Sequence, residues 1–518
     1  MRSDDTGIGS AAAPEVNSGR PHAVVIGSGF GGLASAIRLA ARGYRVTVLE
    51  KLDAPGGRAY TFRQDGFVFD AGPTILTAPH LFRELWEICG RKFEDDIDLR
   101  PIDPFYRIRF NDGTAFEAGT DEEQTRAQIA SLCPEDLEGY ERFKKASEEI
   151  FAAAYTRLAE EPFHRLSTLV KAAPDMIRLG GMRSVYAKVS DYFSDERLRI
   201  AFSFHPLFIG GNPFAATSYY CLISHLERKW GVHYAIGGTG ALVRGLVKLI
   251  TEQGSKLRFN SEVDEILTRE GHVVGIRLIS GEIISCDLVV SNAETGWTYS
   301  RLLRNTPRRV WTDRKVAAAD YSMSLFVWYF GTNRRYEDCP HHTIVLGPRY
   351  EGLLKDIFRR KVLADDFSLY LHRPTASDPS LAPEGCDSFY VLSPVPNLDS
   401  QTDWAVSAEE YRNQIATRLE EVMLPGLRDS IVTERLMTPV DFRERLLSTK
   451  GAAFGFEPKL LQSAWFRPHN VSSDVKGLYL TGAGTHPGAG VPSVLSSAKV
   501  VDRLVPDAAG WCRQGAVS

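Results

Sequence analysis

Cysteine is scarce in this sequence, and no two cysteines have the spacing of a disulfide framework or a metal site. Seven occur among 518 residues, an odd number, with no CxxC pair. Disulfide frameworks and structural zinc sites need paired or closely spaced ligands. The sequence therefore predicts no disulfides and no metal site, and it fits a reducing cytoplasm.

Long apolar runs and a strong net charge are also missing. No run approaches the roughly 18 apolar residues that a membrane-spanning helix needs. The N-terminal residues resemble neither a secretory signal nor an arginine-rich transit peptide, and we expect residues 1–21 to form a disordered tail. A net charge of −4 gives no electrostatic reason to expect a nucleic-acid partner.

A glycine-rich turn lies near the N-terminus, between a predicted strand and a predicted helix in residues 22–50. Gly27, Gly29 and Gly32 form G-x-G-x-x-G. In this motif the glycines permit a tight turn, close approach of a pyrophosphate, and packing of helix on strand. Glu50 ends the next strand, where an acid accepts a hydrogen bond from a ribose 2′-hydroxyl. The pattern predicts a dinucleotide site for FAD or NAD, and the acid argues against NADP.

The segment directly after Glu50 favours FAD over NAD. It reads APGGRAYTF and contains Gly56, Gly57 and Arg58. Together with the glycine turn and the acid, it resembles the FAD-binding fingerprint of the flavin monooxidase-like superfamily, which includes amine oxidases, protoporphyrinogen oxidase and carotenoid desaturases. The resemblance implies that Arg58 lies near the diphosphate or the ribityl chain of FAD.

A second glycine-rich loop, LYLTGAGTHPGAGVPSV at 478–494, lies near the other end of the chain. Gly482, Gly484 and Gly490 permit close approach of a ligand, and a predicted helix begins at Val491. We interpret the two loops as holding opposite ends of one FAD. The helix N-terminus would then stabilise negative charge on the reduced flavin ring.

This second loop and several other segments resemble the bacterial-type phytoene desaturases, also called carotenoid dehydrogenases, and their proteobacterial members in particular. The likeness runs from about residue 22 to about residue 505. Its segments are GLYLTGAGTHPGAGV at 477–491, FDAGPT at 69–74, FIGGNPF at 208–214, GGTGALV at 237–243 and QSAWFRPHN at 462–470.

The resemblance implies an FAD-dependent oxidoreductase that converts phytoene by successive dehydrogenations to neurosporene, lycopene or both. Each step takes a hydride from an allylic carbon to the flavin and a proton from its neighbour. It also implies that Val263 meets the adenine through its backbone and that residues 70–74, including Gly72, pass near the flavin. Catalytic residues stay unassigned. We favour a positioning role for His486 over proton transfer, because the family signature tolerates Gln or Thr there.

Several alternatives stay open on the sequence alone. The substrate could be a related carotenoid, such as C30 diapophytoene or a hydroxylated or methoxylated neurosporene. The chain could instead be an amine oxidase or protoporphyrinogen oxidase, or a non-enzymatic prenyl-binding protein like the Rab escort proteins and GDP-dissociation inhibitors. A quinone or oxygen would accept the electrons.

The predicted fold is α/β, with three parts. A Rossmann-like FAD-binding domain with a parallel sheet comprises residues 22–90, 233–300 and 471–508. A substrate domain with a mixed sheet comprises 91–120 and 301–470, and a helical subdomain comprises 121–232. Basic and apolar residues alternate over 163–193, which is typical either of surface helices or of helices lying in a membrane interface. A hydrocarbon substrate favours the second interpretation, with the protein peripheral on the cytoplasmic side of the inner membrane.

Overall fold

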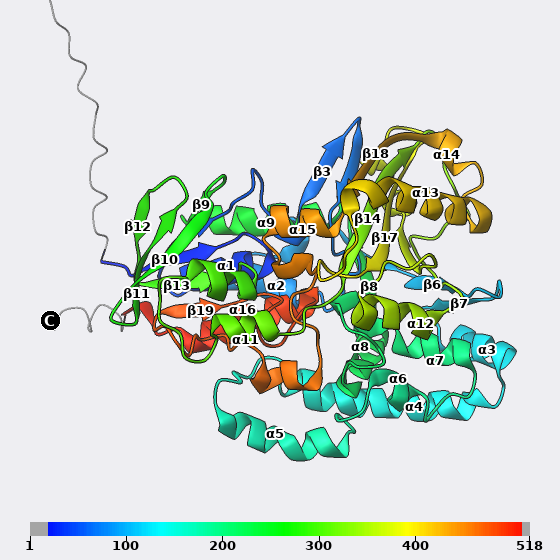
Figure 1. Ribbon diagram of the computed structural model, residues 1–518, viewed down its shortest axis with the longest axis horizontal. Helices are drawn as coiled ribbons and strands as arrows, with labels where there is room; N and C mark the ends of the chain where they lie inside the picture. Colours follow the sequence, from blue (N-terminus) through cyan, green and yellow to red (C-terminus); the bar gives the residue numbers. More distant parts are fainter. Residues whose placement is uncertain (1–18, 510–518) are drawn as a thin grey trace, which may run out of the picture.

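A computed structural model describes residues 19–509 (Figure 1). The tail predicted for residues 1–21 therefore lies almost wholly outside the described residues. A parallel sheet occupies one end of the molecule, and a larger mixed sheet occupies the other end, with a group of helices below it. This arrangement confirms the predicted α/β fold with a parallel sheet and a separate mixed sheet. The boundaries of the three parts stay a prediction.

The strands of the parallel sheet are short apolar segments buried on both faces, as is usual for parallel strands. Along β1, Ala23 and Val25 join one apolar cluster, whereas Val24 and Ile26 join another on the opposite face. Alternate side chains of a strand point to opposite faces, so this one strand supports two layers. Across the sheet the order is β19 (Leu478–Leu480), β13 (Leu288–Ser291), β1 (His22–Ile26), β2 (Arg45–Leu49) and β9 (Lys256–Arg258).

Helices cover one face of the parallel sheet, and a small antiparallel sheet covers the other. Helix α1 lies against the three other helices of this layer. The helices are α1 (Phe30–Ala41), α2 (His80–Ile88), α9 (Thr239–Glu252) and α16 (Val491–Leu504). The small sheet consists of β10 (Val263–Arg269), β11 (His272–Leu278) and β12 (Ile283–Ser285).

The mixed sheet has seven strands, antiparallel except for the β15–β6 pair. Its longest strands are largely buried, and residues 326–330 are fully shielded from solvent. One face packs on α13 (Trp404–Val422), and the other faces a cavity. In order the strands are β18 (Ile431–Met437), β14 (Ser324–Thr332), β17 (Asp387–Val395), β16 (Leu369–His372), β15 (His342–Val345), β6 (Tyr106–Arg109) and β7 (Ala115–Ala118).

The helical part lies below the mixed sheet, and α5 forms its outermost layer in Figure 1. Its helices are α3 (Glu122–Leu132), α4 (Asp136–Ile150), α5 (Leu166–Arg178), α6 (Val185–Val189), α7 (Glu196–Ser203) and α8 (Leu222–Trp230). Between residues 19 and 509, no helix combines the length and the apolar character needed to cross a bilayer.

The described chain also contains two further strand pairs and several short helices. The strand pairs are β3 (Thr61–Gln64) with β4 (Phe67–Asp70) and β5 (Leu99–Ile102) with β8 (Val232–Ala235). The short helices are α10 (Thr295–Trp297), α11 (Asp313–Ala318), α12 (Tyr350–Lys355), α14 (Leu427–Ser430) and α15 (Pro439–Leu446).

Candidate functional site

One large cavity begins at the carboxyl edge of the parallel sheet, where ligands of open α/β sheets usually bind. Its volume is about 580 Å³. It brings together all the residues that the sequence nominated for cofactor binding except Gly32, which lies behind the wall. The lining includes Gly27, Gly29, Glu50, Gly56, Gly57, Arg58, Gly72, Val263, Gly482, Gly484, Gly490 and Val491.

The first glycine loop is built by the close contact of α1 with the turn that precedes it. A Cβ atom on Gly32 would lie 2.0 Å from the carbonyl oxygen of Gly27, so no side chain fits there. Gly29 stands at the N-cap of α1, and no described side chain caps this helix end. The first N–H groups of α1 therefore remain to bind a ligand, and a helix N-terminus favours a negatively charged one.

Glu50 is held in a fixed orientation at the end of β2. One carboxylate oxygen accepts hydrogen bonds from the backbone N–H and the hydroxyl of Ser28, at 2.8 Å and 2.6 Å. The other accepts from the backbone N–H of Leu52 at 2.9 Å. Ser261 donates its backbone N–H to the carbonyl of Glu50. Val263 follows two residues later and therefore lies close to Glu50, and both Glu50 and Val263 line the cavity. This corner is the place where a ribose hydroxyl would bind.

Asn292, just past β13, lies between the two glycine loops and was missed by the sequence reasoning. Cβ atoms added to Gly29, Gly31 and Gly482 would lie 3.0, 2.7 and 2.6 Å from its side-chain amide. The two loops are therefore neighbours at this point, and the second loop then runs along the cavity. Asparagine after a strand is also an ordinary turn residue, so the sequence offered no distinguishing signal.

The second glycine loop is anchored at both ends. Ser497, on α16, accepts the backbone N–H of Gly482 at 2.8 Å. A Cβ atom on Gly484 would lie 2.1 Å from the hydroxyl of Thr295, so the backbone passes tightly there. Gly490 has a φ of 99° and forms the N-cap of α16, again without a side-chain cap among the described residues. A second open helix end at Val491 therefore faces the cavity.

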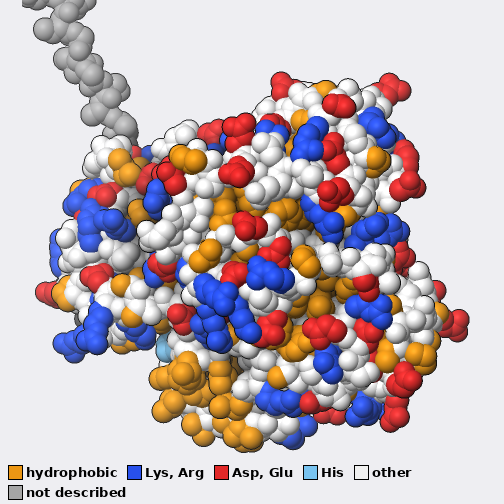
Figure 2. Space-filling view, turned by 45° about the vertical axis from the view of Figure 1, so that its right-hand side comes forward, with side chains coloured by type: hydrophobic (Ala, Val, Ile, Leu, Met, Phe, Trp, Pro, Cys, Tyr) orange, Lys and Arg blue, Asp and Glu red, His pale blue; other side chains and the backbone are white. Residues whose placement is uncertain are grey.

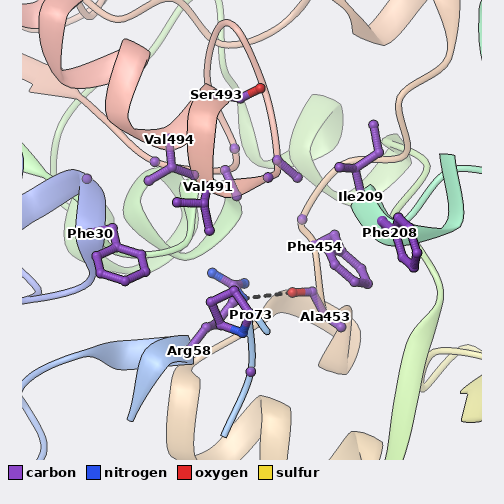
Figure 3. Close-up of a pocket in the computed structure, with 18 of the residues that line it drawn as sticks. Phe30, Arg58, Pro73, Phe208, Ile209, Ala453, Phe454, Val491, Ser493 and Val494 are labelled. Carbon is purple, nitrogen blue, oxygen red and sulfur yellow. Dashed lines mark hydrogen bonds between the residues drawn. The ribbon is translucent and has the colours of Figure 1, made fainter. Parts of the chain in front are cut away.

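Arg58 and Glu294 place opposite charges beside the middle of the cavity. Arg58 donates its Nε–H to the carbonyl of Ala453 at 2.7 Å, as drawn in Figure 3. Burial lowers the pKa of Arg58, and the charge of Glu294 opposes that shift. Glu294 accepts from Thr449 at 2.6 Å through Oε2, whereas Oε1 has no hydrogen-bond partner within residues 19–509. Gly72 packs against the same segment, because a Cβ atom there would lie 2.2 Å from the carbonyl oxygen of Arg58.

Beyond this point the cavity continues between the mixed sheet and the helical part, and its wall becomes largely apolar. Figure 3 shows Phe208, Ile209 and Phe454 at this end, opposite Phe30 and Val491. A buried polar group also lies here: Glu227 accepts a hydrogen bond from Tyr106 at 2.9 Å. Apolar lining residues include Leu222, Leu325, Leu346, Tyr390 and Met437.

His486 is buried where the second glycine loop meets the helical part. Its Nε2 lies 3.0 Å from the carbonyl oxygen of Leu158, so the neutral ring donates Nε2–H to that oxygen. Its ring also packs against Phe163, with 4.7 Å between centroids. Burial lowers the pKa of His486 to about 4. A neutral ring bound to a carbonyl and an aromatic ring joins two segments, in keeping with a positioning role.

A cradle made of backbone suits a long cofactor with a pyrophosphate in its middle. The glycines leave room for it, two uncapped helix ends face it, and Glu50 stands where the ribose of an adenosine would bind. The cavity also continues beyond the glycine loops into a part lined mainly by apolar side chains. These properties fit FAD and define the class of the protein as a flavin-dependent oxidoreductase.

Comparison with known proteins gives the family. Residues 30–501 match the model described as flavin containing amine oxidoreductase. The chain is 52% identical over 491 residues to the phytoene desaturase (neurosporene-forming) of Cereibacter sphaeroides, which covers 94% of this chain and 95% of that protein. It is 49% identical over 487 residues to the phytoene desaturase (lycopene-forming) of Pseudescherichia vulneris, covering 93% and 98%. The chain belongs to the flavin containing amine oxidoreductases and, within them, to the bacterial phytoene desaturases.

Solved structures show the same fold. A crystal structure of an oxidoreductase from Methanosarcina mazei superimposes with a TM-score of 0.64 at 18% identity, covering 93% of this chain and 100% of that one. The family membership confirms the resemblance and the FAD cofactor predicted from the sequence. It decides against the non-enzymatic prenyl-binding alternative.

Replacing Gly32 tests the glycine cradle. We expect Gly32→Ala to reduce the bound flavin roughly tenfold or more, because the new methyl group would displace α1 from the turn that precedes it. Flavin absorbance per chain after desalting measures the loss, and circular dichroism checks folding. The control is Gly281→Ala in an exposed turn, where the methyl group meets no atom within 4 Å and the φ of 89° costs only about 1–2 kcal/mol of backbone strain. Equal flavin content in both variants would contradict this account of the cradle.

The lowered pKa of His486 predicts an acid-sensitive contribution to stability. An unfolded histidine takes up a proton near pH 6.5, whereas folded His486 does so only near pH 4. Its contribution is therefore present above pH 6.5 and is lost as the pH falls toward 4. At pH 5 the loss is about 2 kcal/mol. Urea unfolding at pH 7 and pH 5 should show a smaller pH effect in His486→Gln than in the unaltered chain. Identical pH effects would refute the assignment.

Proposed function

We propose that this chain is a phytoene desaturase that converts phytoene by successive dehydrogenations to neurosporene, lycopene or both. The observation that carries the proposal is the continuity of the cavity, from the glycine cradle into an apolar chamber. The related proteins from Cereibacter sphaeroides and Pseudescherichia vulneris, which span almost the whole chain, support the choice of substrate.

The reaction needs little acid–base or nucleophilic help from the side chains. Bound FAD supplies the acceptor for the hydride that leaves an allylic carbon, and the charge that develops there is delocalised over neighbouring double bonds. The chain has to hold a hydrocarbon in one orientation and exclude water. Phe208, Phe454 and Met437 offer apolar contact for this purpose, and no metal ion or nucleophile is needed.

The helix α5 is the proposed route for the substrate from the membrane. Its inner face carries Leu169, which lines the cavity. Its outer face exposes Leu166, Val170 and Ile177 to 57%, 63% and 70%. A helix that is apolar on both sides is unusual at a protein–water boundary, and a bilayer surface would cover its outer face.

Two neighbouring residues extend the outer face of α5 into a patch. Met182 is 74% exposed and Leu461 is 70% exposed. Figure 2 shows apolar side chains gathered at this lower end of the molecule. The exposed Arg165 and Lys171 lie beside the patch and would bind anionic headgroups. We therefore propose that the protein lies on the cytoplasmic surface of the inner membrane and that a quinone or oxygen accepts the electrons.

Pigment analysis tests the substrate. The chain is expressed in a bacterium engineered to accumulate colourless phytoene, and the extracted carotenoids are separated and identified by their visible spectra. We expect neurosporene, lycopene or both from the unaltered chain and from Gly281→Ala, and none from Gly29→Val. Untouched phytoene beside a flavin-loaded protein would refute the proposal and favour C30 diapophytoene or a hydroxylated or methoxylated neurosporene.

Vesicle flotation tests the membrane surface. Replacing Leu166, Val170, Ile177 and Met182 with Gln should lower binding to vesicles containing anionic lipid by roughly tenfold or more, because several kcal/mol of apolar burial is lost. The matched control replaces Val406 and Val432, which are exposed to 73% and 53% elsewhere on the surface. If the α5 variant keeps its flavin and binds the vesicles as well as the unaltered chain does, the proposed membrane surface is refuted.

A further inference from the structure

Three buried histidines meet at a place that the cofactor cavity does not reach. His342 begins β15, and His372 ends β16 directly opposite it in the strand register. His341 precedes β15, and all three side chains are buried, with at most 6% exposed. One ring nitrogen from each lies within 4.8 Å of the other two. The sequence predicted no cluster of this kind, because two strands 30 residues apart create it.

Hydroxyl groups fix two of the rings through Nδ1. The hydroxyl of Ser377 lies 2.7 Å from Nδ1 of His341. The hydroxyl of Tyr370 lies 2.7 Å from Nδ1 of His342 and 2.6 Å from the hydroxyl of Thr74. Metal-binding histidines in proteins use one ring nitrogen as the ligand and donate the other N–H to an acceptor oxygen, a role that these hydroxyl oxygens can fill.

The Nε2 atoms of the cluster are short of partners. Nε2 of His341 and Nε2 of His372 lie 3.0 Å apart and share one proton at most. Nε2 of His342 is buried without a hydrogen-bond partner in the described part of the chain. A buried polar atom left unpaired carries a free-energy cost in the folded state. A ligand that accepts electron pairs from all three nitrogens would remove this cost.

We propose that Nε2 of His341, His342 and His372 bind a divalent transition-metal ion, best matched by Zn²⁺. Zinc accepts neutral imidazole at about 2.0–2.1 Å, and three-histidine sites complete its tetrahedron with a water molecule. Binding requires each ring to carry its proton on Nδ1. That tautomer lets His341 donate to Ser377 and His342 donate to Tyr370, whose own hydroxyl then donates to Thr74.

The surroundings support a neutral ligand set. Nδ1 of His341 and Nδ1 of His342 are each hydrogen-bonded to a hydroxyl group, so both rings can be neutral with the proton on Nδ1. Arg373, whose charge acts on His341, is paired with the buried carboxylate of Asp387 at 3.3 Å. The ion would join β15 to β16 behind the cavity wall, to which Tyr370 and Thr74 belong.

Metal analysis of the untagged, flavin-loaded protein tests the site. After incubation with Zn²⁺ and desalting, we expect about one zinc per chain in the unaltered protein and at least a fivefold loss in His342→Gln and His372→Gln. With Co²⁺ in place of Zn²⁺, the unaltered protein should give the visible absorption bands of a tetrahedral histidine site. The control is His272→Gln, an exposed histidine on β11 that should leave the metal content unchanged.

The test separates this site from adventitious binding and from the cofactor site. Equal zinc in the unaltered protein, the two cluster variants and the control would overturn the proposal, and so would an unaltered protein that retains neither zinc nor the cobalt bands. Should a cluster variant fail to fold, the zinc content and cobalt spectrum of the unaltered protein decide. The readout is metal content, so it does not depend on desaturase activity.

Discussion

The side-chain amide of Asn292 is the contact on which the cofactor site depends. It occupies the space that side chains on Gly29, Gly31 and Gly482 would fill, so residues from both ends of the chain meet around one carboxamide. Because Asn292 directly follows β13, the position of the contact is set by the central strands of the parallel sheet. The N-termini of α1 and α16, which open toward the cavity, follow the two glycine loops that meet at Asn292.

The same cavity has walls of two kinds, and each follows from the layer that builds it. Where the parallel sheet ends, the wall is backbone, with Glu50 held by Ser28. Where the mixed sheet meets the helical part, the wall is made of aromatic and aliphatic side chains from strands that are buried on both faces. A charged, solvated cofactor and an apolar hydrocarbon require opposite surroundings. The fold provides them in sequence along one passage, with Arg58 and Glu294 near the transition.

The sequence predicted the parts of this site that rest on local geometry. The spacing of Gly27, Gly29, Gly32 and Glu50 is dictated by one strand–turn–helix–strand unit, so it can be recognised without the fold. Contacts between distant segments could not be foreseen. Asn292 is indistinguishable from a turn residue until the second glycine loop is placed beside it. The histidine cluster needs the register of β15 and β16, which neither strand's own pattern contains.

Helix α5 has a kinetic consequence for the proposed reaction. One side of this helix lines the cavity and the other is exposed; on the proposed membrane surface, the lipid phase would be the solvent from which the substrate is drawn. The effective concentration is then the mole fraction of phytoene in the bilayer. Adding buffer would leave turnover unchanged, whereas adding inert lipid would slow it by dilution in two dimensions. Each partly desaturated product can also return to the bilayer. The number of double bonds introduced then depends on whether the intermediate diffuses away in the membrane or binds the enzyme again.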